Sequence, residues 1–514
     1  MNAGNILWID DEVDSLKSHI LFLNKKGFSV QTISNGYDAI EIVQQEKYDI
    51  IFLDENMPGL SGLETLSKLK ELTNTPVIMI TKSEQEHIME DAIGSKISDY
   101  LIKPVNPNQV LLSIKKNLEF TKLINNKTNI VYQREFSAIG SMINSVESFE
   151  DWVDVYKKII YWELELDSLE ENQMLDVLLT QKKDANNNFF KQVQKKYKDW
   201  LALDEMTMSH NVFKKCVFPL ISEKKSTFFI LIDNLRLDQW KVIQPLLEPY
   251  FLMQEDTCCS ILPTATQYCR NSIFSGLLPS EIKSKFPKLW LDDVDDGGKN
   301  MNEKDFLISQ LRDLSAPTNI SFNKVFNIEH GNKVLDRFNE FLNKSLNVII
   351  YNFVDILSHA KTDIKMIKEL ANNEKSYRDL TLIWFKNSPL FELLKKISSS
   401  NSNVIITSDH GTINVNEPSR VVGEKRISSN LRYKTGRKIK FENRDVFSVE
   451  DPEEYMLPKS NISSSYIFAS PNKYFVYPNN YNHYAHHYIN TYQHGGVSME
   501  EMIVPVVSLK SKNE

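Results

Sequence analysis

Acids follow three apolar, strand-like segments in the last three hundred residues of the chain. The segments TFFILID (227–233), LNVIIYNFVD (346–355) and NVIITSD (403–409) each reach an aspartate at their end. In open α/β sheets, ligands bind outside the carboxyl ends of the strands, so these acids are expected to share one site. Alone, Asp409-His410-Gly411 is typical of a strand that ends in a polar turn, so a metal site requires further ligands from other segments.

Other segments supply those ligands. Asp355 and His359 are four residues apart, which places them on one face of any helix that begins there. His494 precedes two glycines, and Thr264 and Thr266 precede a segment of small residues. The complete set of candidate ligands is Asp233, Thr264, Thr266, Asp355, His359, Asp409, His410 and His494.

Histidine nitrogens and carboxylate oxygens are ligands of Zn²⁺, which usually takes four. Divided over two ions, the set gives Asp/His/His for one and Asp/Asp/His for the other. Two ions about 3.5–4 Å apart can hold both oxygens of an in-line phosphoryl displacement, with a threonine between them as nucleophile.

This pattern resembles the alkaline phosphatase superfamily over about residues 225–510. The segment PTATQYCRNSIFSGL is similar in spacing to the nucleophile segment of nucleotide pyrophosphatase/phosphodiesterases, Pro-Thr-x-Thr-Phe-Pro-Asn. The resemblance implies that Thr266, rather than Thr264, is the nucleophile. It also implies two zinc sites, one of Asp233, Thr266, Asp409 and His410, and one of Asp355, His359 and His494.

The sequence departs from that pattern at Cys269, which stands where the family has its phosphate-binding asparagine. Asn271 or Arg270 is expected to contact the substrate phosphate instead.

The basic tract RVVGEKRISSNLRYKTGRKIK (420–440) is either a solvated insertion or a segment that binds a nucleic-acid backbone. Its candidate contacts are Arg420, Arg432 and Arg437. The histidines of NYNHYAHHY, His483, His486 and His487, are expected in an exposed loop, with metal binding as the less favoured alternative.

The first 120 residues alternate strand-like and amphipathic segments. The expected strands are NILWID (5–10), FSVQTI (28–33), DIIFLD (49–54), PVIMIT (76–81) and DYLIKP (99–104). This alternation predicts a doubly wound parallel sheet. Asp10, Asp11 and Asp54 close strands, and oxygen ligands of this kind suit Mg²⁺. Thr81 and Lys103 close the next two strands and could hold a phosphoryl group.

This segment resembles response-regulator receiver domains along its whole length, including the loop around Pro58-Gly59. The resemblance implies that Asp54 is the phosphoacceptor, and that Asp10, Asp11, Asp54 and the backbone carbonyl of Asn56 bind Mg²⁺. It further implies that Thr81, Tyr100 and Lys103 are the switch residues. Phosphorylation is then expected to remodel the face built on the fourth and fifth strands, through which this family often dimerises.

Residues 121–215 carry helical spacing without strand patterns. They predict a helical bundle linker, interrupted by polar stretches such as QKKDANNN (181–188). At helical spacing, Trp152, Tyr156, Trp162 and Trp200 are expected in a core rather than in a ligand site. No helix-turn-helix is legible in this segment.

Composition is that of a globular α/β protein, with 41% hydrophobic and 25% charged residues in 514. The net charge of −8 disfavours a generally basic nucleic-acid coat. Four cysteines without CxxC spacing, and no N-terminal signal pattern or long apolar run, predict a cytoplasmic protein without membrane insertion.

The expected domains are a receiver (1–120), a helical linker (121–215) and an alkaline-phosphatase-like α/β domain of PglZ type (216–514). This order resembles the PorX-type response regulators of type IX secretion. That resemblance implies a PorY-like sensor histidine kinase, an extracytoplasmic-function sigma factor, dimerisation on phosphorylation, and hydrolysis of linear or cyclic oligonucleotides. Two alternatives stay open: a zinc-stabilised adaptor with little turnover, motivated by Cys269, and a direct DNA-binding factor, disfavoured by the acidic charge.

Overall fold

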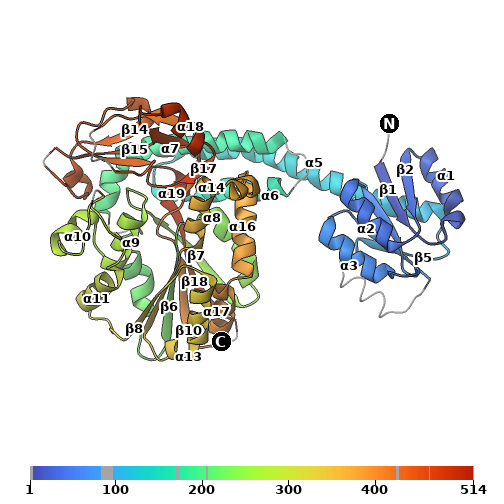
Figure 1. The fold of residues 1–514 in the computed structure, drawn as a ribbon, viewed down its shortest axis with the longest axis horizontal. Coiled ribbons are helices and arrows are strands. Elements are labelled where there is room, and N and C mark those ends of the chain that lie inside the picture. The colour runs from blue at the N-terminus through green and yellow to red at the C-terminus, as the bar shows by residue number, and fades with distance from the viewer. Residues whose placement is uncertain are drawn as a thin grey trace. The chain divides into compact units, whose positions relative to one another are not determined.

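The computed structural model describes residues 4–82, 97–168, 173–203, 206–293, 295–423, 428–461 and 463–512. The chain divides into two compact units, residues 1–135 and 136–514, drawn from blue to red in Figure 1. Among the helices of these ranges, none is long and apolar enough to cross a membrane. All four cysteines are free thiols.

The first unit contains a parallel sheet in the order β2-β1-β3-β4-β5. The expected doubly wound receiver sheet is confirmed, with an apolar cluster on each face. Its strands are β1 (Gly4–Ile9), β2 (Phe28–Ile33), β3 (Ile50–Asp54), β4 (Val77–Thr81) and β5 (Asp99–Ile102). Its helices are α1 (Lys17–Lys25), α2 (Gly36–Gln45), α3 (Gly62–Leu72) and the start of α5 (Pro107–Ser145).

Three long helices connect the sheets: α5, α6 (Phe149–Asp167) and α7 (Gln173–Ala202). The predicted boundary at residue 120 falls inside α5, which continues without a break. The predicted aromatic core is confirmed, because Trp152, Tyr156, Trp162 and Trp200 are buried.

The predicted interruption at 181–188 is wrong, since α7 runs through it. The polar side chains there have buried partners in the second unit. Asn186 donates to Glu500 Oε2 at 2.9 Å and accepts from the backbone N–H of Met499 at 2.8 Å. Lys182 lies 2.9 Å from Glu163 of α6 and 3.2 Å from Glu500. The linker helices therefore form part of the core of this unit rather than a spacer.

The second unit is built on a mixed sheet in the order β7-β18-β10-β6-β9-β8. Its strands are β6 (Ser226–Ile232), β7 (Phe251–Cys259), β8 (Ile320–Val325), β9 (Leu346–Tyr351), β10 (Ser402–Thr407) and β18 (Ile503–Ser511). Strands β10, β6, β9 and β8 are mutually parallel. Strand β18 pairs antiparallel with β10, and β7 in turn pairs antiparallel with β18 at the edge of the sheet. The three acid-tipped strands of the sequence are thus neighbours.

Helices lie on both sides of this sheet, with α9 and α11 on one side and α16 and α17 on the other (Figure 1). The helices are α8 (Leu237–Leu247), α9 (Thr266–Ser275), α10 (Pro279–Lys285), α11 (Glu303–Asp313), α12 (Ile328–Asp336), α13 (Phe338–Phe341), α14 (Phe353–Asp363), α15 (Lys365–Leu370), α16 (Glu374–Lys386), α17 (Pro389–Ser398) and α19 (Met499–Met502). The arrangement confirms the expected α/β fold of this part of the chain.

Residues between β10 and α19 form a subdomain of small sheets. Its strands are β11 (Ile413–Val415), β12 (Glu417–Arg420), β13 (Tyr433–Gly436), β14 (Val446–Val449), β15 (Ser465–Ala469), β16 (Lys473–Val476) and β17 (Thr491–Gln493). The 420–440 tract enters it through β12 and β13, and its residues 424–427 lie outside the described ranges. The segment expected as a histidine loop is instead a helix, α18 (Tyr481–Tyr488), with its three histidines exposed.

Candidate functional site

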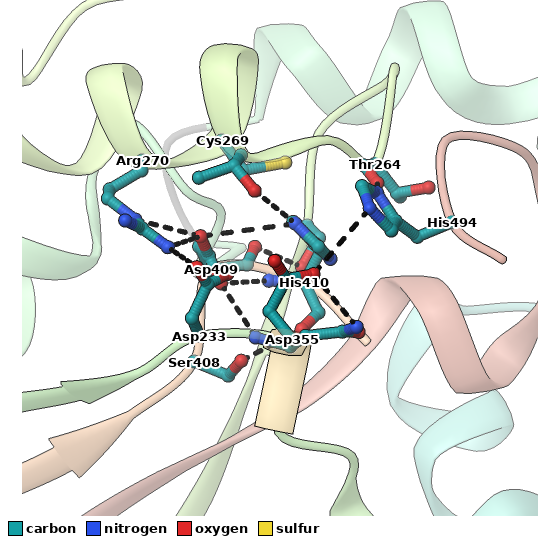
Figure 2. A network of polar contacts seen from close by, with 12 residues as sticks. Asp233, Thr264, Cys269, Arg270, Asp355, Ser408, Asp409, His410 and His494 are labelled. Atoms are coloured by element: carbon teal, nitrogen blue, oxygen red, sulfur yellow. Dashed lines mark hydrogen bonds and ion pairs between the residues drawn. The ribbon is translucent and has the colours of Figure 1, made fainter. Parts of the chain in front are cut away.

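The ends of β6, β9 and β10 carry the acids that the sequence places there. Asp233 follows β6, Asp409 follows β10, and Asp355 lies in the first turn of α14 after β9. Figure 2 shows these acids converging on His410 and His494. Two groups offer ligand atoms that all lie within 4.8 Å of one another: Asp233, Asp409 and His410, and Asp355, His359 and His494.

The first group is buried and lies beside the predicted nucleophile. Thr266 Oγ1 is 3.0 Å from His410 Nε2. Thr266 is also the first residue of α9, and the N-terminal end of a helix favours an anion. The hydroxyl of Thr264, by contrast, is occupied by Gly496 O at 2.9 Å and the N–H of Gly495 at 3.0 Å. The geometry therefore presents Thr266 rather than Thr264 to the acids.

The second group is more open. His359 Nε2 lies 3.5 Å from Asp355 Oδ1, and its side chain is 62% exposed. His494 Nε2 lies 3.9 Å from the same oxygen. The rings of His494 and His410 stack at a centroid distance of 4.3 Å, which places the two groups side by side.

Both inner histidines have a fixed tautomer. His410 Nδ1 lies 3.1 Å from Gly411 O, and His494 Nδ1 lies 3.1 Å from Thr264 O. A carbonyl only accepts, so each Nδ1 carries the proton and each Nε2 offers a lone pair. Burial also lowers the pKa of His494 well below its usual value, which keeps the ring neutral. Neutral imidazoles with outward lone pairs are the form that binds metal.

Arg270 lies against the two acids of the first group. Its Nε is 3.0 Å from Asp409 Oδ2, and its guanidinium also pairs with Asp233. Burial raises the pKa of Asp409, but the Arg270 guanidinium outweighs this and holds the pKa below its usual value. Burial raises the pKa of Asp233 well above its usual value, and Arg270 offsets part of this.

Arg270 is therefore a support for the ligands and not a substrate contact as predicted, since it is 2% exposed and engaged with acids. Asp233 Oδ1 stays buried without a hydrogen-bond partner in the described structure. A buried carboxylate oxygen left this way is costly unless a cation or proton meets it. The donor set fits a divalent cation at this oxygen.

The histidine loops are held by α19. A Cβ on Gly411 would lie 2.0 Å from Glu500 O, so only glycine fits where the chain passes α19. Glu501 accepts from Gly496 N–H at 2.8 Å, and its carbonyl accepts from Gly411 N–H at 3.1 Å. Glu501 thus links the loops that follow His410 and His494.

The structure removes Arg432 from the substrate contacts predicted for it. It is fully buried and pairs with Glu501, with Nη2–Oε2 at 2.6 Å. Its Nε also donates to Glu501 Oε1 at 3.1 Å, and its Nη1 donates to the backbone carbonyl of Ser470 at 2.6 Å. Nothing in the sequence near Glu501 indicates this partner, which lies 69 residues away.

Cys269, which replaces the family's phosphate-binding asparagine, and the other candidate substrate contacts lie in different environments. Cys269 is buried, and its thiol donates to Ile261 O at 3.2 Å. Burial raises the pKa of this thiol, which leaves it protonated. Asn271 donates to Lys299 O at 3.2 Å, while its carbonyl oxygen is buried without a partner in the described ranges. Arg420 and Arg437 are exposed.

A third group lies at the strand ends of the first unit. Asp10, Asp11 and Asp54 offer oxygens within 4.8 Å of one another. Lys103 Nζ lies 2.9 Å from Asp10 and 3.0 Å from Asp54. Burial raises the pKa of Asp54, with Lys103 acting in the opposite direction.

Thr81 and Tyr100, the other two predicted switch residues, lie on the neighbouring strands β4 and β5. Thr81, at the end of β4, donates to Glu55. Tyr100 is 40% exposed on β5, and Asn56 is exposed in the loop after β3.

Replacing Asp54 by asparagine is expected to abolish labelling by acetyl phosphate with Mg²⁺, because the amide cannot form an acyl phosphate. Intact-mass spectrometry would measure the label. Asp14→Asn, at an exposed acid of the same unit, is the matched control and should label normally. Labelling of the Asp54 variant at the wild-type level would contradict the assignment.

Three family models match successive parts of the chain. A response regulator receiver domain model matches residues 6–115, a PorX response regulator linker domain model matches 122–201, and a BREX system PglZ alkaline phosphatase-like domain model matches 212–509. The transcriptional regulatory protein SrrA of Staphylococcus aureus is 32% identical over 120 residues, 23% of this chain and 50% of that protein. The chain thus spans about half the length of the curated relatives it matches.

Two solved structures are similar to the receiver alone. A two-component response regulator from Clostridium difficile is 30% identical, over 22% of this chain and 95% of that one, with a TM-score of 0.22. A receiver domain protein from Clostridium thermocellum is 29% identical, over 23% and 97%, also with a TM-score of 0.22.

The PglZ match covers more than half of the chain, and a receiver and a PorX-type linker precede it. The chain therefore belongs to the PglZ family of alkaline phosphatase-like domains and is a PorX-type two-component response regulator with a phosphatase-like output domain.

Proposed function

We propose that the output domain is a two-metal phosphodiesterase that acts on linear or cyclic oligonucleotides, under control of phosphorylation at Asp54. The observation that carries the proposal is the pair of ligand groups with outward-facing Nε2 lone pairs, joined by stacked His410 and His494. Zinc is the proposed metal, since the ligands are imidazoles and carboxylates. Mg²⁺ is proposed for the receiver acids.

The carboxylate, imidazole and hydroxyl groups of the two ligand groups are of the kinds that bind divalent cations. Asp233, Asp409, His410 and Thr266 would hold one ion, and Asp355, His359 and His494 the other. Bound cations would supply the positive charge that polarises a phosphoryl group and acidifies a nearby hydroxyl.

The residues of the chain have separate tasks in this proposal. Thr266 Oγ1 would attack phosphorus and give up its proton as the P–O bond to the leaving alcohol breaks, and that alcohol would take up a proton on departure. Water would then cleave the bond between Oγ1 and phosphorus, which releases the phosphate monoester and restores the threonine hydroxyl. The N-terminal end of α9 stabilises the negative charge of the phosphoryl oxygens. Arg270 fixes the orientation of Asp233 and Asp409 through its ion pairs with both acids. Glu501 fixes the positions of the two loops that carry His410 and His494 relative to each other.

Removing the metal tests this function. A purified sample is expected to contain about two zinc ions per chain and to hydrolyse bis(p-nitrophenyl) phosphate. Chelation should lower the rate at least about 100-fold, and added Zn²⁺ should restore it, because the metals supply the main electrostatic stabilisation. Elemental analysis and release of p-nitrophenol on one sample measure both quantities.

A second candidate is a zinc-stabilised signalling adaptor that binds a sigma factor. The buried thiol of Cys269 favours it, because this side chain offers no amide to a substrate phosphate. Protein that holds two zinc ions and shows no turnover would support the adaptor and contradict the phosphodiesterase. For either candidate we propose a PorY-like kinase as phosphodonor, dimerisation on phosphorylation and a role in type IX secretion.

A further inference from the structure

Helix α18 carries two pairs of parallel aromatic rings, and all of these rings except Tyr488 are exposed. The rings of His483 and His487 are parallel within 11° at 6.3 Å, and those of Tyr484 and Tyr488 within 12° at 6.2 Å. His483, Tyr484 and His487 are exposed, with Tyr484 at 41%. The two ladders follow from the four-residue spacing of a helix.

The inner side of α18 anchors it to the small-sheet subdomain. Tyr481 and Tyr488 pack against an apolar cluster that includes Ile413 and Tyr474. Tyr474 also donates to Ala485 O. The helix therefore has a fixed inner face. The rings of His483, Tyr484 and His487 lie on its exposed side.

The helix is linked to the open metal-ligand group through β17 and α15. Strand β17 follows α18 and leads directly to His494. Lys368 of α15 donates to His487 O at 3.4 Å, and Gln493 donates to Thr362 at 3.3 Å. Thr362 is one turn beyond His359, the exposed member of that group.

From this placement we infer that α18 is a stacking platform for the unpaired bases of an oligonucleotide whose phosphodiester lies at the metal-ligand groups. The inference rests on the proposed phosphodiesterase function and adds the part of the substrate that the platform recognises. Tyrosine and histidine rings stack on bases of any sequence, since every base has a flat face. Apart from Ala485, α18 carries no aliphatic side chain, so its outer face does not suit an apolar protein partner.

The two lysines of α15 near the platform, Lys365 and Lys368, both have partners in the structure. Lys365 is exposed on α15 but lies 3.9 Å from Glu369, and Lys368 is engaged by His487 O. Binding by the platform should therefore depend on base stacking more than on phosphate neutralisation. A shallow salt dependence of affinity is the expected sign of this balance.

The test compares substrates with and without bases. In the His483→Ala/Tyr484→Ala double variant, the ratio of kcat/KM for a tetrathymidylate to that for bis(p-nitrophenyl) phosphate is expected to fall about tenfold, as for the loss of one base stack. For an abasic oligomer of equal length the ratio should not fall. Tyr161→Ala, at an exposed tyrosine of α6, is the matched control and should keep the wild-type ratio.

Binding provides a readout that is independent of turnover. Fluorescence anisotropy of labelled tetrathymidylate on zinc-loaded Thr266→Ala protein is expected to show about tenfold weaker binding when His483 and Tyr484 are also replaced. Unchanged binding, or equal losses for the abasic oligomer, would overturn the platform. If the wild type binds the tetrathymidylate through α18 but hydrolyses no diester, the platform stands and the phosphodiesterase proposal fails.

Discussion

Replacing Thr266 by alanine is expected to lower kcat for bis(p-nitrophenyl) phosphate by about 10³-fold or more, as for the loss of other catalytic nucleophiles. Thr266 Oγ1 is the hydroxyl that lies 3.0 Å from His410 Nε2, beside the first acid group. The change removes one of the four proposed ligands of this ion and leaves Asp233, Asp409 and His410 in place. Zinc content, measured by elemental analysis, should therefore stay close to that of the wild type.

Two further variants sharpen this result. Thr266→Ser keeps a hydroxyl at the same place and should retain much of the rate. Thr264→Ser keeps the hydrogen bonds to Gly495 and Gly496, and it should act like the wild type if Thr264 only supports the loop. A Thr266→Ala protein with full zinc content and wild-type turnover would remove Thr266 from the mechanism.

Arg270→Met is expected to produce the largest loss of stability. Removing one partner of a buried ion pair costs about 3–5 kcal/mol, because the other charges stay buried without it. Here Asp233, Asp409 and Glu303 would lose their shared guanidinium. The thermal midpoint of metal-free protein should fall by roughly 6–10 °C at about 2 °C per kcal/mol.

Zinc should recover part of this loss, since a divalent cation restores positive charge beside Asp233 and Asp409. Calorimetry with and without Zn²⁺ measures both effects. Arg337→Met removes an exposed pair with Glu340 at 2.8 Å and serves as the matched control, with an expected cost below about 1 kcal/mol. Equal midpoints for the two variants without metal would show that Arg270 does not hold the acids.

The sheet and the acid positions could be predicted because they depend on local patterns. Buried strands are apolar runs of five to seven residues, such as β6, and the side chain that follows lies at the sheet edge. The segment order then brings Asp233 and Asp409 together. In the same way, the four-residue spacing of Asp355 and His359 anticipates their shared face on α14.

The supporting residues could not be predicted because their partners are distant in the chain. Arg270 follows Thr266 by one helical turn and looked like a phosphate contact, but only the tertiary fold shows the acids that engage it. Arg432 meets Glu501 across a whole subdomain. The polar stretch in α7 likewise resembles a break until Glu500 is seen against Asn186.

The contact between α7 and α19 also limits where recombination can join this output domain to a different N-terminal module. A fragment beginning at residue 216 would lack Lys182 and Asn186, and Glu500 would lose both of its partners. Glu500 adjoins the loop that carries His410, so the cut would reach the proposed metal-ligand groups. Genetic recombination that gives this output domain a new sensor-facing module should therefore join the two within α5, and leave α6 and α7 with the output domain they complete.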